Sequence, residues 1–326
     1  MKIVVTPPFT AEQKEWIERA AGTAPAGTEQ ARQLVFCEKP DITPKLLADA
    51  EVILGNLSDP QQIKWAPSLK WIQLNNAGTE GYCTPGLLPE GAVLTNATGA
   101  YGLAISEHMI GCLFLLRKKL QLYHSNQLAH TWKSEGHVGV VQGTTVLVIG
   151  LGDIGLTFAR KMKALGCHTI GIKRRVGQAP EGVDELYGLD SLDSLLPHAD
   201  VVAMSLPGNA STQHILDRRR IGLLPCSAVV INVGRGTAID TDALSDALYA
   251  GRIAGAALDV TDPEPLPPDH PLWDAPNAIL TPHVSGGYSL PETLQQIAQI
   301  FAENLSRYLA GEELRNVVDM ETGYCR

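Results

Sequence analysis

One ten-residue segment, Val146–Gly155, restricts the fold of this chain more than any other feature. Its sequence, VLVIGLGDIG, runs from four β-favouring apolar residues into a turn with Gly150, Gly152 and Gly155, and the helix-like segment Leu156–Leu165 follows. In such a strand–turn–helix unit, the first glycine allows a tight turn, the second lets the backbone approach a pyrophosphate, and the third lets the helix pack closely on the strand. The N–H groups at the helix start favour negative charge. The segment therefore predicts a dinucleotide-binding unit.

Composition and charge exclude several classes of protein. The chain has 326 residues, which is enough for about two domains. Its formal net charge of −9 argues against nucleic acid or an anionic membrane as the main partner. No apolar run of the sequence reaches the length of a membrane span, and the longest candidate, Met109–Leu116, is expected to be a buried helix segment. The first residues, MKIVVTP, are typical of a strand and not of a signal peptide.

The six cysteines indicate neither a disulfide framework nor a zinc site. They are scattered along the sequence, and none belongs to a CxxC pair. We therefore expect free thiols, no metal site and a reducing, cytoplasmic environment.

Short apolar segments alternate with helix-like segments in two sets. In the first set, strands are expected at Lys2–Thr6, Ala31–Phe36, Glu51–Leu54, Trp71–Leu74 and Val93–Thr95, and helices at Ala11–Ala21 and Thr43–Ala48. The second set follows the long apolar helix Ser106–Leu120. It comprises Val146–Ile149 with its helix, His168–Ile172, the short helix Leu192–Leu195, Val201–Ser205, Ile221–Leu224, Val229–Val233, Thr241–Tyr249, Gly255–Asp259 and Ala278–Thr281. Short strands that are apolar on both faces are typical of buried parallel sheets.

This pattern predicts an α/β fold with two Rossmann-like, doubly wound domains. The second set carries the glycine turn and is interpreted as the dinucleotide-binding domain, whereas the first set lacks such a turn and is interpreted as a flavodoxin-like domain. The last helix, Pro291–Ala310, is ended by Gly311 and has no strand left to join in the second set. We therefore expect it to return to the first domain.

That return makes the first domain discontinuous. It would comprise residues 1–99 and 287–326, and the dinucleotide-binding domain would comprise residues 100–286. The chain would cross between the domains near Gly99–Gly102 and Val284–Ser289, two glycine-rich segments, with a cleft between the domains.

Three polar residues follow separate predicted strands of the second set. Arg235 lies in NVGRG, Glu264 in DVTDPEPL and His283 in TPHV. Open parallel sheets bind ligands at the carboxyl ends of their strands. Arginine can hold a carboxylate with two hydrogen bonds, histidine transfers protons near neutral pH, and a neighbouring carboxylate favours the protonated ring. Taken alone, each residue also fits a structural role, as a turn-closing arginine, a loop carboxylate or a strand-end cap.

With these residues in place, the chain resembles the D-isomer-specific 2-hydroxyacid dehydrogenases. The resemblance covers nearly the whole chain and rests on GLGDIG, NVGRG, LDVTDPEPL and TPH, in the family's order and with similar spacing. It implies that Arg235 holds the substrate carboxylate and polarises the 2-oxo group. It implies that His283 donates the proton in reduction and accepts it in oxidation, and that Glu264 orients and charges His283. A hinged homodimer, with the first domain as the substrate domain, is also implied.

A basic run replaces the acidic residue that NAD-specific sites usually carry. In such sites Asp or Glu lies about twenty residues after the glycines and bonds the ribose 2′-hydroxyl. Here Lys173, Arg174 and Arg175 follow the strand at Ile172, and no acid stands in the expected place. This favours NADP(H), with Arg174 as the main contact of the 2′-phosphate, over NAD(H). A solvated basic run is the alternative, and it is the interpretation we give to Arg218–Arg220.

The resemblance also implies further cofactor contacts. Asp153 and Ile154 would offer backbone N–H groups to the pyrophosphate, and Leu206 and Pro207, with Thr212 nearby, would flank the adenosine. Val233 and Asp259 would meet the nicotinamide, although Asp259 also fits a capping role. The full expected set is Gly150, Gly152, Asp153, Ile154, Gly155, Lys173, Arg174, Arg175, Leu206, Pro207, Thr212, Val233, Asp259 and Gly286.

For the substrate, Asn76, Ala77 and Gly78 resemble the family's small-residue loop, whose backbone N–H groups meet the carboxylate. The pair Asn75-Asn76 departs from the family's serine- or glycine-led version and leaves the exact donors open. The segment Leu54-Gly55-Asn56 is expected to line the side-chain pocket, and Tyr288 is expected to close it. Trp132, in a polar segment between the domains, is expected to cover the cleft of this chain or of a partner. Ordinary packing is the alternative for these last three features.

The sequence thus predicts an NAD(P)H-dependent reductase of small 2-oxo acids to D-2-hydroxy acids, with NADPH preferred. One alternative is NAD-linked oxidation of a hydroxy acid such as a phosphoglycerate, against which the basic run argues. The other is a dinucleotide-sensing binding protein without turnover. The side chain of the substrate does not follow from the sequence.

Overall fold

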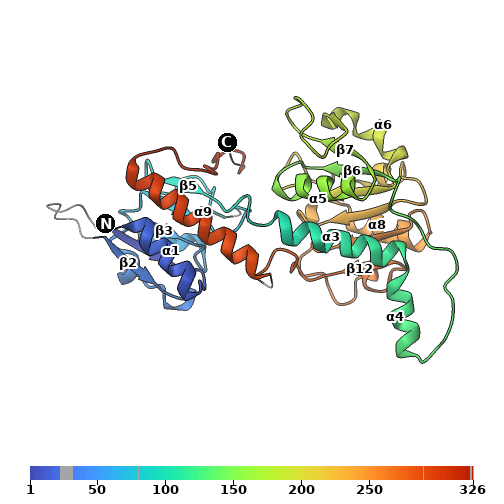
Figure 1. Ribbon diagram of the computed structural model, residues 1–326, viewed down its shortest axis with the longest axis horizontal. Helices are drawn as coiled ribbons and strands as arrows, with labels where there is room; N and C mark the ends of the chain where they lie inside the picture. The colour runs from blue at the N-terminus through green and yellow to red at the C-terminus, as the bar shows by residue number, and fades with distance from the viewer. Residues whose placement is uncertain (23–31, 80, 289, 324, 326) are drawn as a thin grey trace. The chain divides into compact units, whose positions relative to one another are not determined.

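The computed structural model describes residues 1–22, 32–79, 81–288, 290–323 and 325. The chain forms two compact units, each of which contains its own parallel sheet (Figure 1). Unit 1 comprises Met1–Tyr101 and Tyr288–Arg326, and unit 2 comprises Gly102–Gly287. The predicted α/β class with two doubly wound sheets is confirmed.

The sheet of unit 1 has the strand order β2-β1-β3-β4-β5, and all neighbouring strands are parallel. Its strands are β1 (Lys2–Val5), β2 (Gln33–Phe36), β3 (Ala50–Leu54), β4 (Trp71–Gln73) and β5 (Val93–Thr95). This is the order of flavodoxin-like folds, in which the winding reverses between β1 and β3. The first residue of the expected strand Ala31–Phe36 lies outside the described residues.

Helices cover this sheet and include the last one of the chain. They are α1 (Ala11–Ala21), α2 (Pro44–Leu47) and α9 (Pro291–Ala310). Thr10 and Gln13 form a capping box at the start of α1, and Gly311, at φ 71°, ends α9. The two long helices α1 and α9 pack side by side (Figure 1), and the rings of Phe9 and Phe301 meet edge to face at 5.7 Å.

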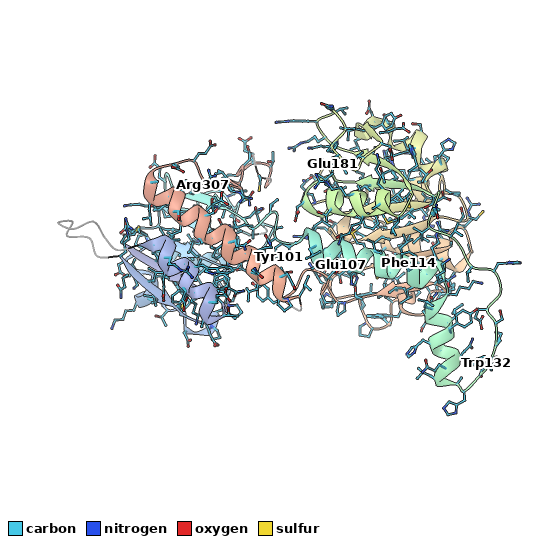
Figure 2. The ribbon with its side chains drawn as sticks, viewed as in Figure 1. Tyr101, Glu107, Phe114, Trp132, Glu181 and Arg307 are labelled. Carbon is cyan, nitrogen blue, oxygen red and sulfur yellow. The ribbon has the colours of Figure 1, made fainter. Side chains whose placement is uncertain are left out.

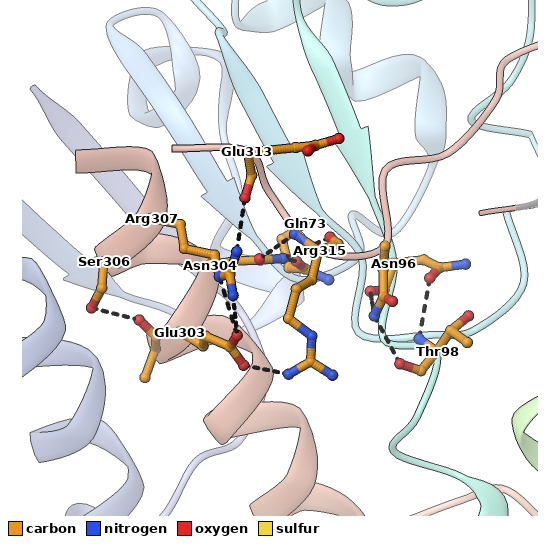
Figure 3. Close-up of polar contacts among 11 residues, drawn as sticks. Gln73, Asn96, Thr98, Glu303, Asn304, Ser306, Arg307, Glu313 and Arg315 are labelled. Carbon is orange, nitrogen blue, oxygen red and sulfur yellow. Dashed lines mark hydrogen bonds and ion pairs between the residues drawn. The ribbon is translucent and has the colours of Figure 1, made fainter. Parts of the chain in front are cut away.

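A buried polar network fixes α9 to the sheet (Figure 3). Asn304 Nδ2 donates to Gln73 Oε1 at 2.7 Å and to the Arg315 carbonyl at 3.0 Å, and Asn304 Oδ1 accepts from the Arg315 N–H at 2.8 Å. Gln73 Oε1 also accepts from Thr95 Oγ1 at 2.7 Å. Asn304, Gln73 and Thr95 are all 0% exposed. Because buried polar groups need partners, the network specifies one docking of α9 and the segment after it.

The sheet of unit 2 has the order β12-β11-β10-β9-β6-β7-β8 and is likewise parallel throughout. Its strands are β6 (Thr145–Ile149), β7 (His168–Ile172), β8 (Glu185–Tyr187), β9 (Val201–Met204), β10 (Val229–Asn232), β11 (Gly255–Leu258) and β12 (Ala278–Leu280). Counted from β6, this is the Rossmann order 3-2-1-4-5-6 with one further strand. The winding reverses beside β6, where the glycine turn lies.

The helices of unit 2 differ in part from those expected. They are α3 (Gly102–Arg117), α4 (Leu120–Leu128), α5 (Asp153–Ala164), α6 (Leu192–Leu195), α7 (Arg218–Ile221) and α8 (Thr241–Tyr249). The helix expected at Ser106–Leu120 is α3, which ends earlier because Lys119 adopts a left-handed conformation at φ 57°. The expected burial of Met109–Leu116 is confirmed for Met109, Cys112, Leu113 and Leu116. Among the described residues, none of the helices is both long and apolar enough to cross a membrane.

Trp132 belongs to unit 2, follows α4 and is fully exposed (Figure 2). Helix α4 was not predicted, because it buries none of its residues and so carries no apolar pattern.

Asn304→Ala is expected to lower the free energy of unfolding by about 1–3 kcal/mol, because it takes a partner from the buried Gln73 Oε1 and Arg315 N–H. Urea unfolding measures the change. Ser306→Ala on the same helix is the matched control, since it removes a hydroxyl that donates to the Ala302 carbonyl on an exposed face, and it should cost less than about 0.5 kcal/mol. Equal effects of the two substitutions would show that the network does not hold α9.

Candidate active site

The turn between β6 and α5 has the geometry of a phosphate cradle. Gly150 adopts φ 98°, which favours glycine. A Cβ on Gly155 would lie 1.9 Å from the Gly150 carbonyl oxygen, so the helix meets the turn as closely as glycine allows. A Cβ on Gly152 would meet nothing within 4 Å, so the space beside the helix start is open. Gly152 is the N-cap of α5 without a side-chain cap, which leaves first-turn N–H groups for an anion.

The side chain of Asp153 is directed to α3, not to this opening. Its Oδ2 accepts from the Gly102 N–H at 2.8 Å. A carboxylate facing bound phosphates would repel them, so this contact leaves the backbone of Asp153 as its contribution to the cradle. The residues present therefore fit a dinucleotide.

The basic run lies at the carboxyl end of β7, the strand next to β6. Lys173, Arg174 and Arg175 are exposed. The Lys173 N–H donates to the Tyr187 carbonyl of β8 at 3.1 Å, which fixes the start of the run beside β8.

In the second basic run Arg218 and Arg219 are exposed, which agrees with the expectation of a solvated run, and all three arginines are also paired with acids. Arg219 and Arg220 contact Asp193 at 2.8 and 2.7 Å, and Arg218 contacts Asp246 at 2.8 Å. Hydrogen bonds from Arg219 and Arg220 lower the pKa of Asp193 to about 2. The run joins α7 to its neighbours.

The residues expected around the adenosine and nicotinamide differ in exposure. A Cβ on Gly150 would lie 3.0 Å from Leu206 Cδ2, so Leu206 is next to the glycine turn. Thr212 is buried, and its hydroxyl donates to the Pro207 carbonyl at 2.7 Å. Thr212 therefore shapes this loop from inside. Val233 is 6% exposed and offers little surface to a ligand.

A buried carboxylate, that of Asp259, organises the loop after β12. Asp259 is 2% exposed. Its Oδ1 accepts from Thr281 Oγ1 at 2.6 Å and from the Val284 N–H at 2.9 Å, and its Oδ2 accepts from the Ser285 N–H at 3.0 Å and Ser285 Oγ at 2.5 Å. Its carbonyl accepts from the His283 N–H at 2.8 Å. Three consecutive N–H groups of the loop thus donate hydrogen bonds to Asp259.

This loop presents His283 to Glu264. His283 adopts φ 51°, a left-handed conformation that is uncommon outside glycine. Its Nδ1 lies 2.6 Å from Glu264 Oε1, and the two side chains are 47% and 42% exposed. A carboxylate accepts a hydrogen bond from Nδ1–H, so Nε2 is the ring nitrogen that remains available to a ligand. The pair can therefore exchange a proton with a bound molecule.

Arg235 lies in a tight turn beside the Glu264 segment. A Cβ on Gly236 would lie 1.9 Å from the Thr261 carbonyl oxygen, so the NVGRG turn meets the segment that leads to Glu264 directly. Asn232 Nδ2 donates to the Arg235 carbonyl at 2.9 Å. The Arg235 guanidinium donates from Nη1 to the Gly234 carbonyl at 2.7 Å. The three expected residues follow β10, β11 and β12, which are neighbours in the sheet.

Sequence reasoning missed the hydroxyl groups and the histidine that surround Asp259. Thr281 and Ser285 flank His283, and that flanking position in a loop after a strand was the available signal. His108 of α3 lies 3.3 Å from Thr281 Oγ1 and 3.5 Å from Cys112 Sγ. Burial raises the pKa of Cys112 to about 11, so its thiol stays protonated.

The expected substrate residues of unit 1 lie at the carboxyl ends of β3 and β4. Gly55, at φ 123°, is buried, and a Cβ there would lie 2.0 Å from Thr6 Oγ1, so this position requires glycine. Asn76 is exposed, and the Ala77 carbonyl accepts from Asn96 Nδ2 at 2.6 Å. Tyr288 contacts Asn75, one residue before the loop.

Asp259→Asn is expected to loosen the loop, because one acceptor oxygen becomes an NH2 group that faces N–H donors. The Val284 and Ser285 amide hydrogens should exchange at least about tenfold faster, since a hydrogen bond to a charged group contributes about 1.5–3 kcal/mol. Hydrogen exchange followed by NMR measures this. Thr281→Val is the matched control, because it removes one hydroxyl but keeps both amide acceptors. Unchanged exchange in Asp259→Asn would contradict the anchoring role.

Comparisons with known proteins agree with this geometry. Residues 110–285 match the family model described as "D-isomer specific 2-hydroxyacid dehydrogenase, NAD binding domain". A glyoxylate reductase of Thermofilum pendens is 30% identical over 82% of this chain and 80% of its own length. A D-3-phosphoglycerate dehydrogenase of Methanocaldococcus jannaschii is 31% identical over 84% of this chain, but this chain spans 52% of that protein.

Solved structures resemble the whole chain. A D-isomer specific 2-hydroxyacid dehydrogenase family protein of Aeromonas salmonicida has a TM-score of 0.83 at 31% identity, over 98% of this chain and 99% of that one. The NADPH-dependent glyoxylate/hydroxypyruvate reductase SmGhrA of Sinorhizobium meliloti, solved with NADP and sulfate, has a TM-score of 0.80 at 28% identity, over 99% of each chain. The chain belongs to the D-isomer specific 2-hydroxyacid dehydrogenase family.

Proposed function

We propose that this protein reduces small 2-oxo acids to D-2-hydroxy acids and prefers NADPH. The observation that carries the proposal is the half-exposed contact of 2.6 Å between His283 Nδ1 and Glu264 Oε1, at the carboxyl edge of the sheet that carries the glycine turn. Unit 2 is assigned to the dinucleotide and unit 1 to substrate contacts.

Each residue of the site has a defined task in this reaction. A bound nicotinamide would supply the hydride for C2 of the oxo acid. Arg235 holds the substrate carboxylate with two hydrogen bonds and polarises the 2-oxo group. Glu264 accepts a hydrogen bond from Nδ1–H of His283 and orients the ring, so that Nε2–H donates to the oxygen on C2. The loop Asn76–Gly78 adds backbone N–H donors to the carboxylate.

The cofactor preference is supported by the basic run. Lys173, Arg174 and Arg175 are exposed directly after β7, where a 2′-phosphate would meet positive charge instead of an acid. The similar Sinorhizobium meliloti reductase is NADPH-dependent and was solved with NADP. NAD-linked oxidation of a phosphoglycerate is the second candidate, because a relative with 31% identity is a D-3-phosphoglycerate dehydrogenase. The same basic run disfavours it.

We also propose that the protein is a cytoplasmic homodimer. Exposed apolar side chains gather on α4 and the segment after it, namely Leu120, Leu128, Trp132, Val138 and Val140. A second copy that covered them would bring Trp132 to a subunit contact. Sedimentation equilibrium tests the dimer, for which a species of one chain mass would be contrary evidence, and cell fractionation tests the location.

The proposed function predicts oxidation of NADPH with glyoxylate, hydroxypyruvate or phenylpyruvate, measured as initial rates, and slower oxidation of NADH at equal concentration. Arg174→Ala should raise the KM for NADPH at least about tenfold, because a charged hydrogen bond contributes about 1.5–3 kcal/mol, and should leave the KM for NADH unchanged. Arg219→Ala in the paired run is the matched control. Equal or higher kcat/KM with NADH would refute the preference. Cofactor binding without turnover would favour the sensing alternative.

His283→Ala should lower kcat about 10²–10⁴-fold, because a positioned proton donor contributes that much. Glu264→Gln keeps an acceptor for Nδ1–H but removes the carboxylate, so kcat should fall less than in His283→Ala. His270→Ala is the matched control, because His270 also contacts a carboxylate, that of Asp242, at 3.2 Å. Near-normal turnover of His283→Ala with both cofactors would remove His283 from the mechanism.

A further inference from the structure

Asn75 and Asn56 clamp the carboxyl ends of two neighbouring strands of unit 1. Asn75 is 4% exposed and lies two residues after β4, and Asn56 lies two residues after β3. The Asn56 N–H donates to Asn75 Oδ1 at 2.5 Å, and the Asn75 N–H donates to Asn56 Oδ1 at 2.9 Å. Each side chain therefore binds the backbone of the other residue.

This clamp fixes the direction of the Asn75 amide. A backbone N–H can donate and cannot accept, so the atom that faces Asn56 N must be the oxygen. The two hydrogens on Nδ2 are then available, and they face Tyr288 Oη at 2.6 Å and Asn76 Oδ1 at 3.2 Å. The Tyr101 hydroxyl donates to the Asn75 carbonyl.

The two tyrosines stand at the two points where the chain passes between the units. The chain leaves unit 1 after Tyr101 and returns to it at Tyr288. Tyr101 is 7% exposed, and burial raises the pKa of both phenols, so their hydroxyl groups stay protonated. Both crossings are thus bonded to one residue, one through its backbone and one through its side chain. That same residue directly precedes the loop Asn76–Gly78.

We propose that Asn75 is a positioning residue for 2-oxo acid reduction, which holds the loop Asn76–Gly78 in register with both segments that join the units. This inference rests on the proposed function, which assigns that loop to the substrate carboxylate. Loss of the Asn75 amide frees the Tyr288 hydroxyl, the Asn76 side chain and the Asn56 N–H together. Substrate binding by the loop then weakens, while the dinucleotide residues of unit 2 are untouched.

The first test compares substrate and cofactor binding in Asn75→Ala. The KM for the best 2-oxo acid should rise about tenfold, which corresponds to one lost hydrogen bond of about 1.4 kcal/mol, and the Kd for NADPH, measured by fluorescence, should stay unchanged. Asn304→Ala is the matched control, because it breaks a buried amide network elsewhere in unit 1 and should lower stability without raising KM. An unchanged KM in Asn75→Ala, or an equal rise in Asn304→Ala, would overturn the proposal.

The second test uses the different ways in which the tyrosines bind. Tyr288→Phe removes a partner of the Asn75 side chain, so its effect on KM should not add to that of Asn75→Ala. Tyr101→Phe removes a partner of the Asn75 carbonyl, which alanine keeps, so its effect should add. Tyr288→Phe keeps the ring and by itself should raise KM. If Asn75→Ala does not fold, this rise tests the contact between the Tyr288 hydroxyl and the Asn75 side chain. Full additivity in both pairs would overturn the role of the side chain.

Hydrogen exchange provides a readout that needs no turnover. The Asn56 amide should exchange about tenfold faster in Asn75→Ala than in the wild type, and equally fast in Asn304→Ala and the wild type. If the wild type reduces no 2-oxo acid, the proposed function fails, and this measurement still decides whether Asn75 orders the loop ends. Unchanged exchange of Asn56 would overturn that ordering.

Discussion

The candidate active site depends on the hydrogen bonds that the loop after β12 donates to Asp259. A buried carboxylate is costly unless donors replace its water, and here Thr281, Val284 and Ser285 supply four hydrogen bonds. These bonds, with that from the His283 N–H to the Asp259 carbonyl, hold the histidine in its left-handed conformation. The ring then faces Glu264. Asp259 thereby orders the loop that carries His283, the proposed proton donor.

The two units order their loops by different means. Unit 2 uses glycine where backbone must meet backbone, at Gly155 against Gly150 and at Gly236 against Thr261. Unit 1 uses reciprocal amide hydrogen bonds between Asn56 and Asn75. In both units the ordered loops lie at the carboxyl ends of parallel strands. Ligands of doubly wound sheets bind at these ends.

Much of the fold followed from local patterns. Apolar runs predicted the buried strands of both sheets, and the glycine spacing predicted the turn between β6 and α5. Strand β8 was not predicted because it is a short edge strand with partly exposed residues. Helix α4 was not predicted because it buries none of its residues. The expected end of α3 was too late because Lys119 adopts a left-handed backbone conformation. For β8 and α4 the missing information was tertiary burial, which a single sequence does not carry.

Of the site, the sequence predicted residue types at strand ends but not their partners. Glu264 and His283 are 19 residues apart, and their contact depends on how the loops after β11 and β12 fold. The donors around Asp259, the acids that pair with Arg218–Arg220 and the bonds of Asn75 to Tyr101 and Tyr288 likewise join distant segments. Their roles in catalysis stay predictions.

The most direct test of the account is the configuration of the product. Hydroxypyruvate and NADPH would be incubated with the protein, and the glycerate formed would be separated on a chiral column. The proposed reaction yields D-glycerate in proportion to the NADPH consumed. L-glycerate, a racemic mixture or NADPH consumption without glycerate would contradict it.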